Sequence, residues 1–410
     1  MGKSLSKSRF IELFGDPFLI DEKEKVPFKN AIAETVKGPF GSDMKKSLFV
    51  PKSDTTYKVF SQVNAIQKDA TAGDYYISAE YYEKMKRFTV NSGDYIVTCD
   101  GTLGKIYCLP ENIEKGVISS SLLRIALNKD VISNVYFETI WNMYMLPMLV
   151  RRSRNACLVH LPSAKDIGNL PVPIPNIDKQ RDYDKFSNQI DKSKFILQKM
   201  IEKLELLKKS RFVEMFGTPV TNNKKWETVP LKQACSLITD GSHFSPEAEE
   251  NGEYPMLSVK DMGENNFNYD ECKYIGKETF NNLVSNGCCP QKNDVLVAKD
   301  GSYWKKAFVV NEDKKQVLLS SIAILRPDNQ KISSRFLRDY VLSKEITSLV
   351  DRQFVTGTAL KRVILKGIRE IPIYLPPIEL QKKYEKQINQ LDKSKLILQK
   401  QLEDLVGETK

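Results

Sequence analysis

Two stretches of the chain carry apolar residues at the spacing of a long helix with a single apolar seam. The first stretch has steps of 7, 7, 4 and 3 residues between its seam positions, which are Tyr183, Ile190, Leu197, Ile201 and Leu204. About 200 residues later the same steps recur at Tyr384, Leu391, Leu398, Leu402 and Leu405. Lys, Asp, Glu and Gln fill most positions between them. This heptad pattern predicts two helices, from about residue 177 to 212 and from about 377 to 410, that pair through their seams.

Both helices interrupt the seam and begin in the same way. Ser193 and Ser394 are expected in an inward slot, where a small polar residue would allow close helix approach and specify register. A proline-rich run precedes each helix, at 171–175 and 372–377. Proline fixes the backbone and lacks an N–H, so each run is expected to end a globular domain and to set the helix start.

The seams are part of a repeat that covers the whole chain. SNQIDKSKFILQKM at 187–200 returns as INQLDKSKLILQKQ at 388–401, and LPVPIPNIDKQ at 170–180 returns as IPIYLPPIELQ at 371–381. GDYIVTCDGTLGK at 93–105 resembles NDVLVAKDGSYWKK at 293–306. A period of about 200 residues is too long for a solenoid, so it indicates duplication of a domain together with its helix.

The repeat is circularly permuted. SRFVEMFGTP at 210–219 follows the first long helix, but its counterpart, SRFIELFGDP, lies at 8–17 and not after the second helix. The two chain ends therefore make one complete repeat, which implies that they lie together and that the two seams pair antiparallel within the chain. The alternative is that the seams are dimerisation coiled coils joining two chains.

Between the helices lie two segments of mixed pattern. Short β-branched and aromatic runs such as DYIVTC and DVLVAKDG alternate with turn signals, and amphipathic helices are expected at 134–145 and 333–343. We predict an α+β fold: two tandem α/β recognition domains, each with a mixed, partly curled sheet, separated by long antiparallel coiled-coil helices with an internal pseudo-two-fold, circular repeat. The predicted limits are 1–15 for a helical segment that completes the C-terminal repeat, 16–175 and 218–376 for the domains, and 176–217 and 377–410 for the helical spacers.

Composition narrows the classes of function. The net charge of +10, from 62 Lys and Arg against 52 Asp and Glu, suits a polyanionic partner. With only His160 and His243, and seven cysteines without a CxxC pair, neither an imidazole-based metal site nor a disulfide framework is expected. The start of the chain lacks the apolar core of a signal peptide, and the apolar stretch 131–150 contains polar residues and a proline, so we expect a cytoplasmic protein with no membrane association.

Donor-rich loops are the candidate contact sites for nucleic acid. Each domain opens with a Gly-rich polar stretch, VKGPFGSDMKKS at 36–47 and ITDGSHFSP at 238–246, and carries an Asp-Gly turn at 100–101 or 300–301 followed by basic residues. Aromatic residues lie among the basic ones at Phe40, Tyr303 and Trp304, and a second basic cluster precedes each proline-rich run. Such loops can present donors to phosphates and base edges. The candidates are Lys37, Ser42, Lys45, Lys46, Lys105, Arg151, Arg152, Arg154, Asp240, Ser242, His243, Lys299, Ser302, Tyr303, Lys305, Lys306, Arg352, Lys361 and Arg362.

Motifs of the relevant enzymes are missing from the sequence. There is no FxGxG loop or NPPY tetrad of a methyltransferase, no GxxxxGK[ST] phosphate loop and no GxSxG elbow. Asp261 followed by Glu271 and Lys273 loosely fits a metal-dependent nuclease pattern, but the first repeat has no counterpart. The sequence therefore predicts no catalytic residue, no metal and no cofactor in this chain.

This organisation resembles the DNA specificity subunits of type I restriction-modification systems over essentially the full chain. The resemblance rests on the duplicated domain, on the proline-then-Gln entry into each heptad helix (IPNIDKQ and LPPIELQ) and on the permutation. DGSHFSP at 240–246 is similar to the element that often opens these recognition domains, whereas KGPFGSD at 37–43 departs from it.

The resemblance implies a recognition subunit in which each domain reads one half of a split, asymmetric double-stranded DNA site and the helices set the gap. It implies two modification (methyltransferase) subunits as partners, which would bring S-adenosylmethionine, and restriction (translocase and nuclease) subunits, which would bring ATP and Mg. A methyltransferase-fused restriction enzyme and a structural coiled-coil adaptor without sequence reading are the alternatives.

Overall fold

The computed structural model describes residues 5–153, 160–301, 304–357 and 361–407. The chain divides into two compact units, residues 1–198 with 400–410, and residues 199–399. The last residues of the chain thus group with its first helix, as the split repeat predicts. The boundaries between the units lie within the two long helices. They therefore differ from the predicted domain limits, which lie at the helix ends.

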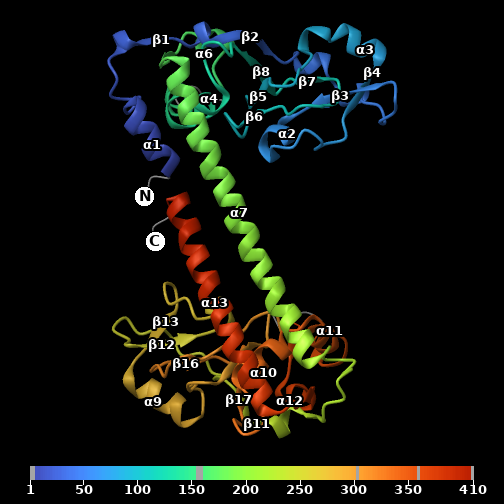
Figure 1. The fold of residues 1–410 in the computed structure, drawn as a ribbon, viewed down its shortest axis with the longest axis vertical. Coiled ribbons are helices and arrows are strands. Elements are labelled where there is room, and N and C mark those ends of the chain that lie inside the picture. The colour runs from blue at the N-terminus through green and yellow to red at the C-terminus, as the bar shows by residue number, and fades with distance from the viewer. Residues whose placement is uncertain (1–4, 154–159, 302–303, 358–360, 408–410) are drawn as a thin grey trace. The chain divides into compact units, whose positions relative to one another are not determined.

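Unit 1 is built from short strands and helices (Figure 1). Its strands are β1 (Lys25–Pro27), β2 (Ile32–Lys37), β3 (Thr56–Phe60), β4 (Tyr76–Ser78), β5 (Tyr95–Thr98), β6 (Ile106–Cys108), β7 (Gly116–Ile118), β8 (Leu122–Leu127) and β9 (Pro171–Pro173). Its helices are α1 (Leu5–Phe14), α2 (Gln62–Gln67), α3 (Ala79–Lys84), α4 (Asn134–Ile140), a π-helical turn (Trp141–Met145), α5 (Leu146–Ser153), α6 (Ala164–Gly168) and the first part of α7 (Ile177–Phe216).

Unit 2 repeats this order of elements. Its strands are β10 (Thr228–Pro230), β11 (Cys235–Asp240), β12 (Tyr254–Leu257), β13 (Lys273–Ile275), β14 (Val295–Ala298), β15 (Ala307–Val309), β16 (Val317–Leu318), β17 (Ile322–Pro327), β18 (Val355–Thr356), β19 (Arg362–Val363) and β20 (Pro372–Tyr374). Its helices are α8 (Leu231–Ala234), α9 (Lys277–Ser285), α10 (Ser334–Val341), α11 (Lys344–Gln353), α12 (Leu365–Glu370) and most of α13 (Ile378–Val406).

Each domain has a four-stranded and a three-stranded sheet, besides short two-stranded ones, where one mixed, partly curled sheet was predicted. The strand order β2-β8-β5-β6 in unit 1 equals β11-β17-β14-β15 in unit 2, and the pairings of both are antiparallel. A three-stranded sheet, β4-β3-β7 or β13-β12-β16, contains the parallel pair. The fold class is nevertheless the predicted α+β, with the duplication visible in strand order and register.

The central strands of the four-stranded sheets are buried on both faces. Tyr95 and Val97 of β5 pack into the core that contains the helices, whereas Ile96 packs into a second core on the other face. Because side chains alternate across a strand, two cores on opposite faces require the continuous apolar runs YIVT and VLVA.

One aromatic cluster in each unit explains the permuted SRF segment. In unit 1, Phe10 and Phe14 of α1 lie 5.4 and 5.8 Å from the ring of Tyr183 on α7. In unit 2, Phe212 and Phe216 at the end of α7 lie 5.7 and 5.2 Å from Tyr384 on α13. Helix α1 therefore takes, in unit 1, the place that the last turns of α7 take in unit 2.

Buried glutamines explain the proline-then-Gln entry into the long helices. The side-chain oxygen of Gln180 accepts a hydrogen bond from the N–H of Ser133 at 2.9 Å, and its amide donates to the carbonyls of Val131 and Pro175. Gln381 makes the equivalent bonds, including 2.9 Å to the N–H of Ser333. Since both glutamines have 0% exposure, each fastens the first turn of a long helix to its own domain.

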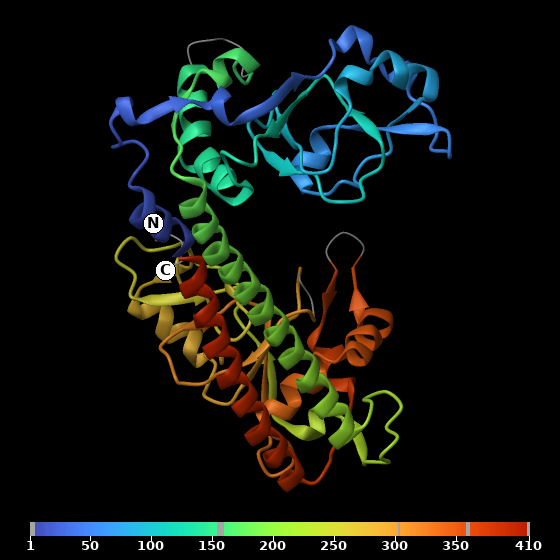
Figure 2. The ribbon, with the colours of Figure 1, turned by 45° about the horizontal axis from the view of Figure 1, so that its top comes forward.

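Within unit 2, α7 and α13 run antiparallel (Figures 1 and 2). Lys208 pairs with Asp392 at 3.0 Å and Glu205 pairs with Lys395 at 2.9 Å. The residue numbers of the partners on α13 decrease as those on α7 increase, which is the pairing of antiparallel helices. Of the predicted seam positions, Tyr183, Ile190 and Tyr384 are buried. The others are half-buried: Leu197, Ile201, Leu204, Leu391, Leu398, Leu402 and Leu405.

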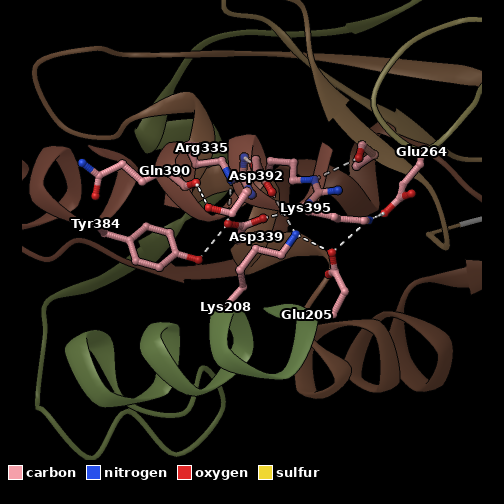
Figure 3. Close-up of polar contacts among 12 residues, drawn as sticks. Glu205, Lys208, Glu264, Arg335, Asp339, Tyr384, Gln390, Asp392 and Lys395 are labelled. Atoms are coloured by element: carbon pink, nitrogen blue, oxygen red, sulfur yellow. Dashed lines mark hydrogen bonds and ion pairs between the residues drawn. The ribbon is translucent and has the colours of Figure 1, made fainter. Parts of the chain in front are cut away.

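The predicted inward slot at Ser193 and Ser394 is wrong. Both serines are exposed, and the position after Ser394 holds Lys395, which is only 9% exposed. The helical step there is four residues and not three, which turns the serine outward. Lys395 forms ion pairs of 2.9 Å with both Glu205 and Glu264 (Figure 3), so a buried lysine with two acidic partners occupies the slot.

A network of charged residues fastens α10 to the helices of unit 2 (Figure 3). Asp339 of α10 accepts hydrogen bonds from Arg335 at 2.9 Å, Arg338 at 2.7 Å and the Tyr384 hydroxyl at 2.8 Å. Arg335 also reaches Asp392 of α13 at 2.6 Å. At the corresponding place in unit 1, the Thr139 and Tyr183 hydroxyls lie 3.1 Å apart, so the two domains are attached by different chemistry.

Candidate nucleic-acid interface

The Asp-Gly turns form the centre of an equivalent edge in each domain. After β5 the N–H of Leu161 donates to the Cys99 carbonyl at 2.8 Å, and after β14 the N–H of Val363 donates to the Lys299 carbonyl at 2.9 Å. Isolated backbone bridges pair Asp100 with His160 and Asp300 with Arg362. Each turn is therefore held against a second segment that reaches it from the helical side of the domain.

The Gly-rich stretches lie beside these turns and are equivalent despite their different sequences. A Cβ atom on Gly38 would lie 1.9 Å from the Ser119 carbonyl oxygen, and one on Gly241 would lie 2.1 Å from the Leu318 carbonyl oxygen. No side chain fits at such distances, so both positions require glycine. The departure of KGPFGSD from DGSHFSP thus concerns side chains, while the backbone keeps the same close approach.

A tryptophan anchors the Asp-Gly turn in each domain, but it comes from the helical region in unit 1 and from the turn itself in unit 2. In unit 1 the indole N–H of Trp141, which follows α4, donates to the Gly104 carbonyl at 2.9 Å. In unit 2 the indole of Trp304, in the turn itself, donates to the Val341 carbonyl of α10 at 2.9 Å. Trp304 is 1% exposed, so the prediction that it interleaves with basic residues at the surface is wrong; it holds the turn in place.

The candidates of domain 1 that the structure describes are exposed. Lys37 ends β2, Ser42 lies in a 3₁₀ turn (Gly41–Asp43), and Lys45, Lys46 and Lys105 follow in the two loops. Arg151 on α5 lies over the ring of Phe18 at 5.6 Å. Arg154 and the side chain of Arg152 lie outside the described residues.

Three candidates of domain 2 are buried and have structural roles. Lys299 is 5% exposed and Asp240 8% exposed, and they form an ion pair of 3.1 Å. The Ser242 hydroxyl donates to the Phe244 carbonyl at 2.6 Å. The prediction that these three side chains contact DNA is therefore wrong. Their hydrogen-bonding and charged groups are paired within the fold, where they position the loop.

The remaining candidates of domain 2 lie on several elements. His243 is exposed, with its Nε2 atom 3.3 Å from Asp240. Lys305 is exposed, while Lys306 donates to the Met262 carbonyl at 2.6 Å. The second basic cluster is divided between α11, which carries Arg352, and the region of β19, which has exposed Lys361 and Arg362. Ser302 and Tyr303 lie outside the described residues.

His160 and the exposed apolar residues of the long helices were not predicted from the sequence. The Nδ1 atom of His160 lies 2.5 Å from Asp100, directly on the domain 1 edge. Phe195 and Ile196 on α7 are 62% and 50% exposed, and the repeat-related Leu396 and Ile397 on α13 are 67% and 60% exposed. The repeated letters KSKFILQK and KSKLILQK were the available signal, because apolar pairs outside the seam have no place in a helix pair alone.

Two groups that could suggest chemistry have structural roles instead. Burial raises the pKa of the Cys99 thiol to about 11, so it is a packed thiol at neutral pH and not a nucleophile. Asp261 accepts hydrogen bonds from the N–H and hydroxyl of Ser258 at 2.8 and 2.9 Å, which makes it the cap of its own turn. Within the described ranges, no three His, Cys, Asp or Glu residues are grouped to hold a metal ion, and no helix is long and apolar enough to cross a membrane.

The chain has a duplicated domain with paired loops and fastened helices, and its second half matches a known family model. Residues 223–407 match the family model described as the type I restriction modification DNA specificity domain. The type I restriction enzyme MjaVIII specificity subunit of Methanocaldococcus jannaschii is 22% identical over 342 residues, which cover 78% of this chain and 77% of that protein.

Solved structures were also found to be similar to this chain. A chain from a study of complex assembly and conformational transition of the type I R-M system aligns over 93% of both chains at 17% identity, with a TM-score of 0.59, and so shares the fold. A type I S subunit from M. genitalium aligns over 93% of this chain and 92% of its own at 15% identity, with a TM-score of 0.48. Residues 223–407 thus belong to the type I DNA specificity domain family. The resemblance of the chain to type I specificity subunits is confirmed.

Proposed function

We propose that each domain of this DNA recognition subunit reads one half of a split, asymmetric double-stranded target. One observation carries the proposal: the two edges share a backbone but differ in side chains. At the surface of these edges domain 1 has the exposed residues Lys37, Lys45 and His160, whereas domain 2 has the exposed residues His243, Lys305 and Arg362. Because bases are distinguished by their patterns of donors and acceptors, equal frames with different side chains suit two different half-sites.

We propose further that the long helices set the unspecified gap. Helix α7 has 40 residues, which span about 60 Å at 1.5 Å per residue. The buried glutamines fasten each domain to the first turn of its helix, so helix length is transmitted to the domain without a flexible joint.

The exposed apolar pairs fit two copies of a modification subunit. Phe195 with Ile196, and Leu396 with Ile397, occupy equivalent positions of the two repeats, so one partner surface could bind twice. In this proposal the modification subunits supply S-adenosylmethionine chemistry, and restriction subunits supply ATP- and Mg-dependent cleavage. This chain contributes recognition alone.

Lengthening both long helices by four residues tests the proposal. Insertions after Lys199 and after its repeat counterpart Lys400 add about one turn, roughly 6 Å, close to two base-pair steps of about 3.4 Å. We expect both half-sites to stay unchanged while the gap grows by one or two base pairs, as measured by methylation mapping of the complex with its modification subunit.

The matched control replaces Lys199 and Lys400 by alanine without changing helix length, and should leave the gap as it was. An unchanged gap in the insertion variant would show that the helices do not set the spacing. Altered half-sites would show that bases are read by another part of the chain. A structural adaptor would leave the methylation pattern independent of either change.

A further inference from the structure

Two phenylalanines are the most exposed aromatic side chains among the described residues. Phe40 is 82% exposed and Phe244 is 71% exposed. Burial of a phenylalanine side chain contributes about 1.5–3 kcal/mol. Both rings lack most of that contribution in the isolated chain, so each suits a surface that a partner covers.

The two rings occupy the same loop of the two domains. Phe40 lies two residues after Gly38, and Phe244 lies three residues after Gly241, the two glycines that press against backbone carbonyls at the domain edge. The loop that carries each ring thus departs from the equivalent point of β2 or β11. One exposed ring at this place could be accidental, but its presence in both copies, whose surrounding residues otherwise differ, indicates a shared use.

Both rings are held on fixed backbone. The Phe40 carbonyl accepts a hydrogen bond from the N–H of Asp43 at 2.9 Å, which closes a 3₁₀ turn. The Ser242 hydroxyl donates to the Phe244 carbonyl at 2.6 Å and accepts from its N–H at 3.1 Å. A ring that projects from ordered backbone needs little further ordering when it binds, which favours insertion into a partner.

The surroundings of Phe40 indicate the chemistry of the partner. Exposed Lys37, Lys45 and Lys46 flank Phe40 in one short segment, and the exposed His243 side chain precedes Phe244. The exposed residues Glu247, Glu249 and Glu250 follow Phe244, so the partner of Phe244 is inferred from its equivalent place in the repeat. The lysines favour a partner with negative charge, and the ring favours a partner with flat apolar surfaces. Stacked base pairs with their phosphates offer both. An apolar groove of a protein partner would satisfy the ring but not the lysines.

We propose that Phe40 and Phe244 are wedge residues that insert against a base step, one in each half-site, and partly unstack it. This inference rests on the proposed function, because it assumes that these edges face DNA. Apolar wedges of this kind kink a duplex, and pyrimidine–purine steps unstack most easily. Each half-site is therefore expected to contain a deformable step that is selected by shape in addition to direct contacts.

The test uses the full complex with its modification subunits and duplexes that carry 2-aminopurine, a base whose fluorescence rises when it unstacks. With the unaltered chain, we expect a rise at one position in each half-site. Phe40→Ala should abolish the rise in one half-site only, and Phe244→Ala in the other only. Each should weaken binding about tenfold to hundredfold, the range of a lost base–aromatic stack.

Two variants distinguish insertion of a wedge from non-specific hydrophobic binding. Phe40→Leu keeps an apolar wedge without an aromatic face, so it should retain part of the fluorescence rise that Phe40→Ala loses. Leu19→Ala removes an apolar side chain that is 84% exposed and lies outside the loop. It should change neither the 2-aminopurine fluorescence nor the binding affinity.

Unchanged fluorescence and affinity in both alanine variants would overturn the wedge proposal while leaving half-site reading intact. Loss of modification subunits from the Phe40→Ala complex would also overturn it, by showing a protein-docking role. Failure of the unaltered complex to prefer any sequence would instead contradict the proposed function itself.

Discussion

Replacing Asp339 by asparagine is expected to destabilise unit 2 by about 3 kcal/mol. Asp339 is the acceptor for Arg335, Arg338 and the Tyr384 hydroxyl, and its side chain is 12% exposed. Asparagine keeps the shape but removes the negative charge between two largely buried guanidinium groups. Breaking one partner of a buried ion network costs about 3–5 kcal/mol, and the contact of Arg335 with Asp392 retains part of it.

Hydrogen exchange resolved by residue is the appropriate measurement, because it reports α10 and α13 separately from unit 1. The matched control is Thr139→Val, which removes the single hydroxyl pair with Tyr183 in unit 1 and should cost about 1 kcal/mol. Equal small losses in both variants would show that the network does not fasten α10.

The same carboxylate predicts the pH dependence of unit 2. Burial raises the pKa of Asp339, but Arg335 and Arg338 outweigh burial and hold it below the ordinary value of 3.8. A lowered pKa in the folded state means that the stabilisation is fully present above pH 3.8 and is lost as the pH falls through the lowered value. The stability difference between the unaltered chain and Asp339→Asn should therefore shrink in acid.

Substituting alanine at Gly241 should weaken recognition of one half-site, and alanine at Gly38 should weaken recognition of the other. Each added Cβ would lie about 2 Å from a backbone carbonyl oxygen, that of Ser119 or Leu318, so the Gly-rich loop must move away from that backbone. Such overpacking costs about 1–3 kcal/mol, which corresponds to about tenfold to hundredfold weaker specific binding.

Competition binding with duplexes in which one half-site is randomised measures this effect. Gly41→Ala is the control, because its Cβ would meet open space in the same loop as Gly38. If Gly38→Ala and Gly41→Ala behaved alike, the close approach would have no bearing on recognition.

The repeat and its permutation could be predicted from the sequence because similar residues recur about 200 positions apart along the chain. The heptad steps, the proline-then-Gln entry and the split SRF segment all correspond to contacts that recur in both units, such as those of Tyr183 and Tyr384. These signals survive because packing and hydrogen bonding at a helix start need particular residues at particular spacings.

The recognition edge was less predictable because it depends on which side chains the fold leaves outside. Lys299 resembles an ideal phosphate ligand in sequence, but β17 pairs with both β11 and β14, and the sheet thereby gives Lys299 a buried partner, Asp240. Trp304 has the sequence surroundings of a surface aromatic, but α10 supplies a carbonyl for its indole and buries it. Such outcomes are set by tertiary neighbours, which spacing along the chain does not reveal.

The measurement that tests the central claim most directly is single-molecule methylation mapping in a host that carries this chain with its modification subunit. We predict a motif of two short specified sequences separated by an unspecified gap of fixed length, with different halves because the two edges carry different side chains. A contiguous motif, a symmetric motif, or methylation that stays the same without this chain would contradict this prediction.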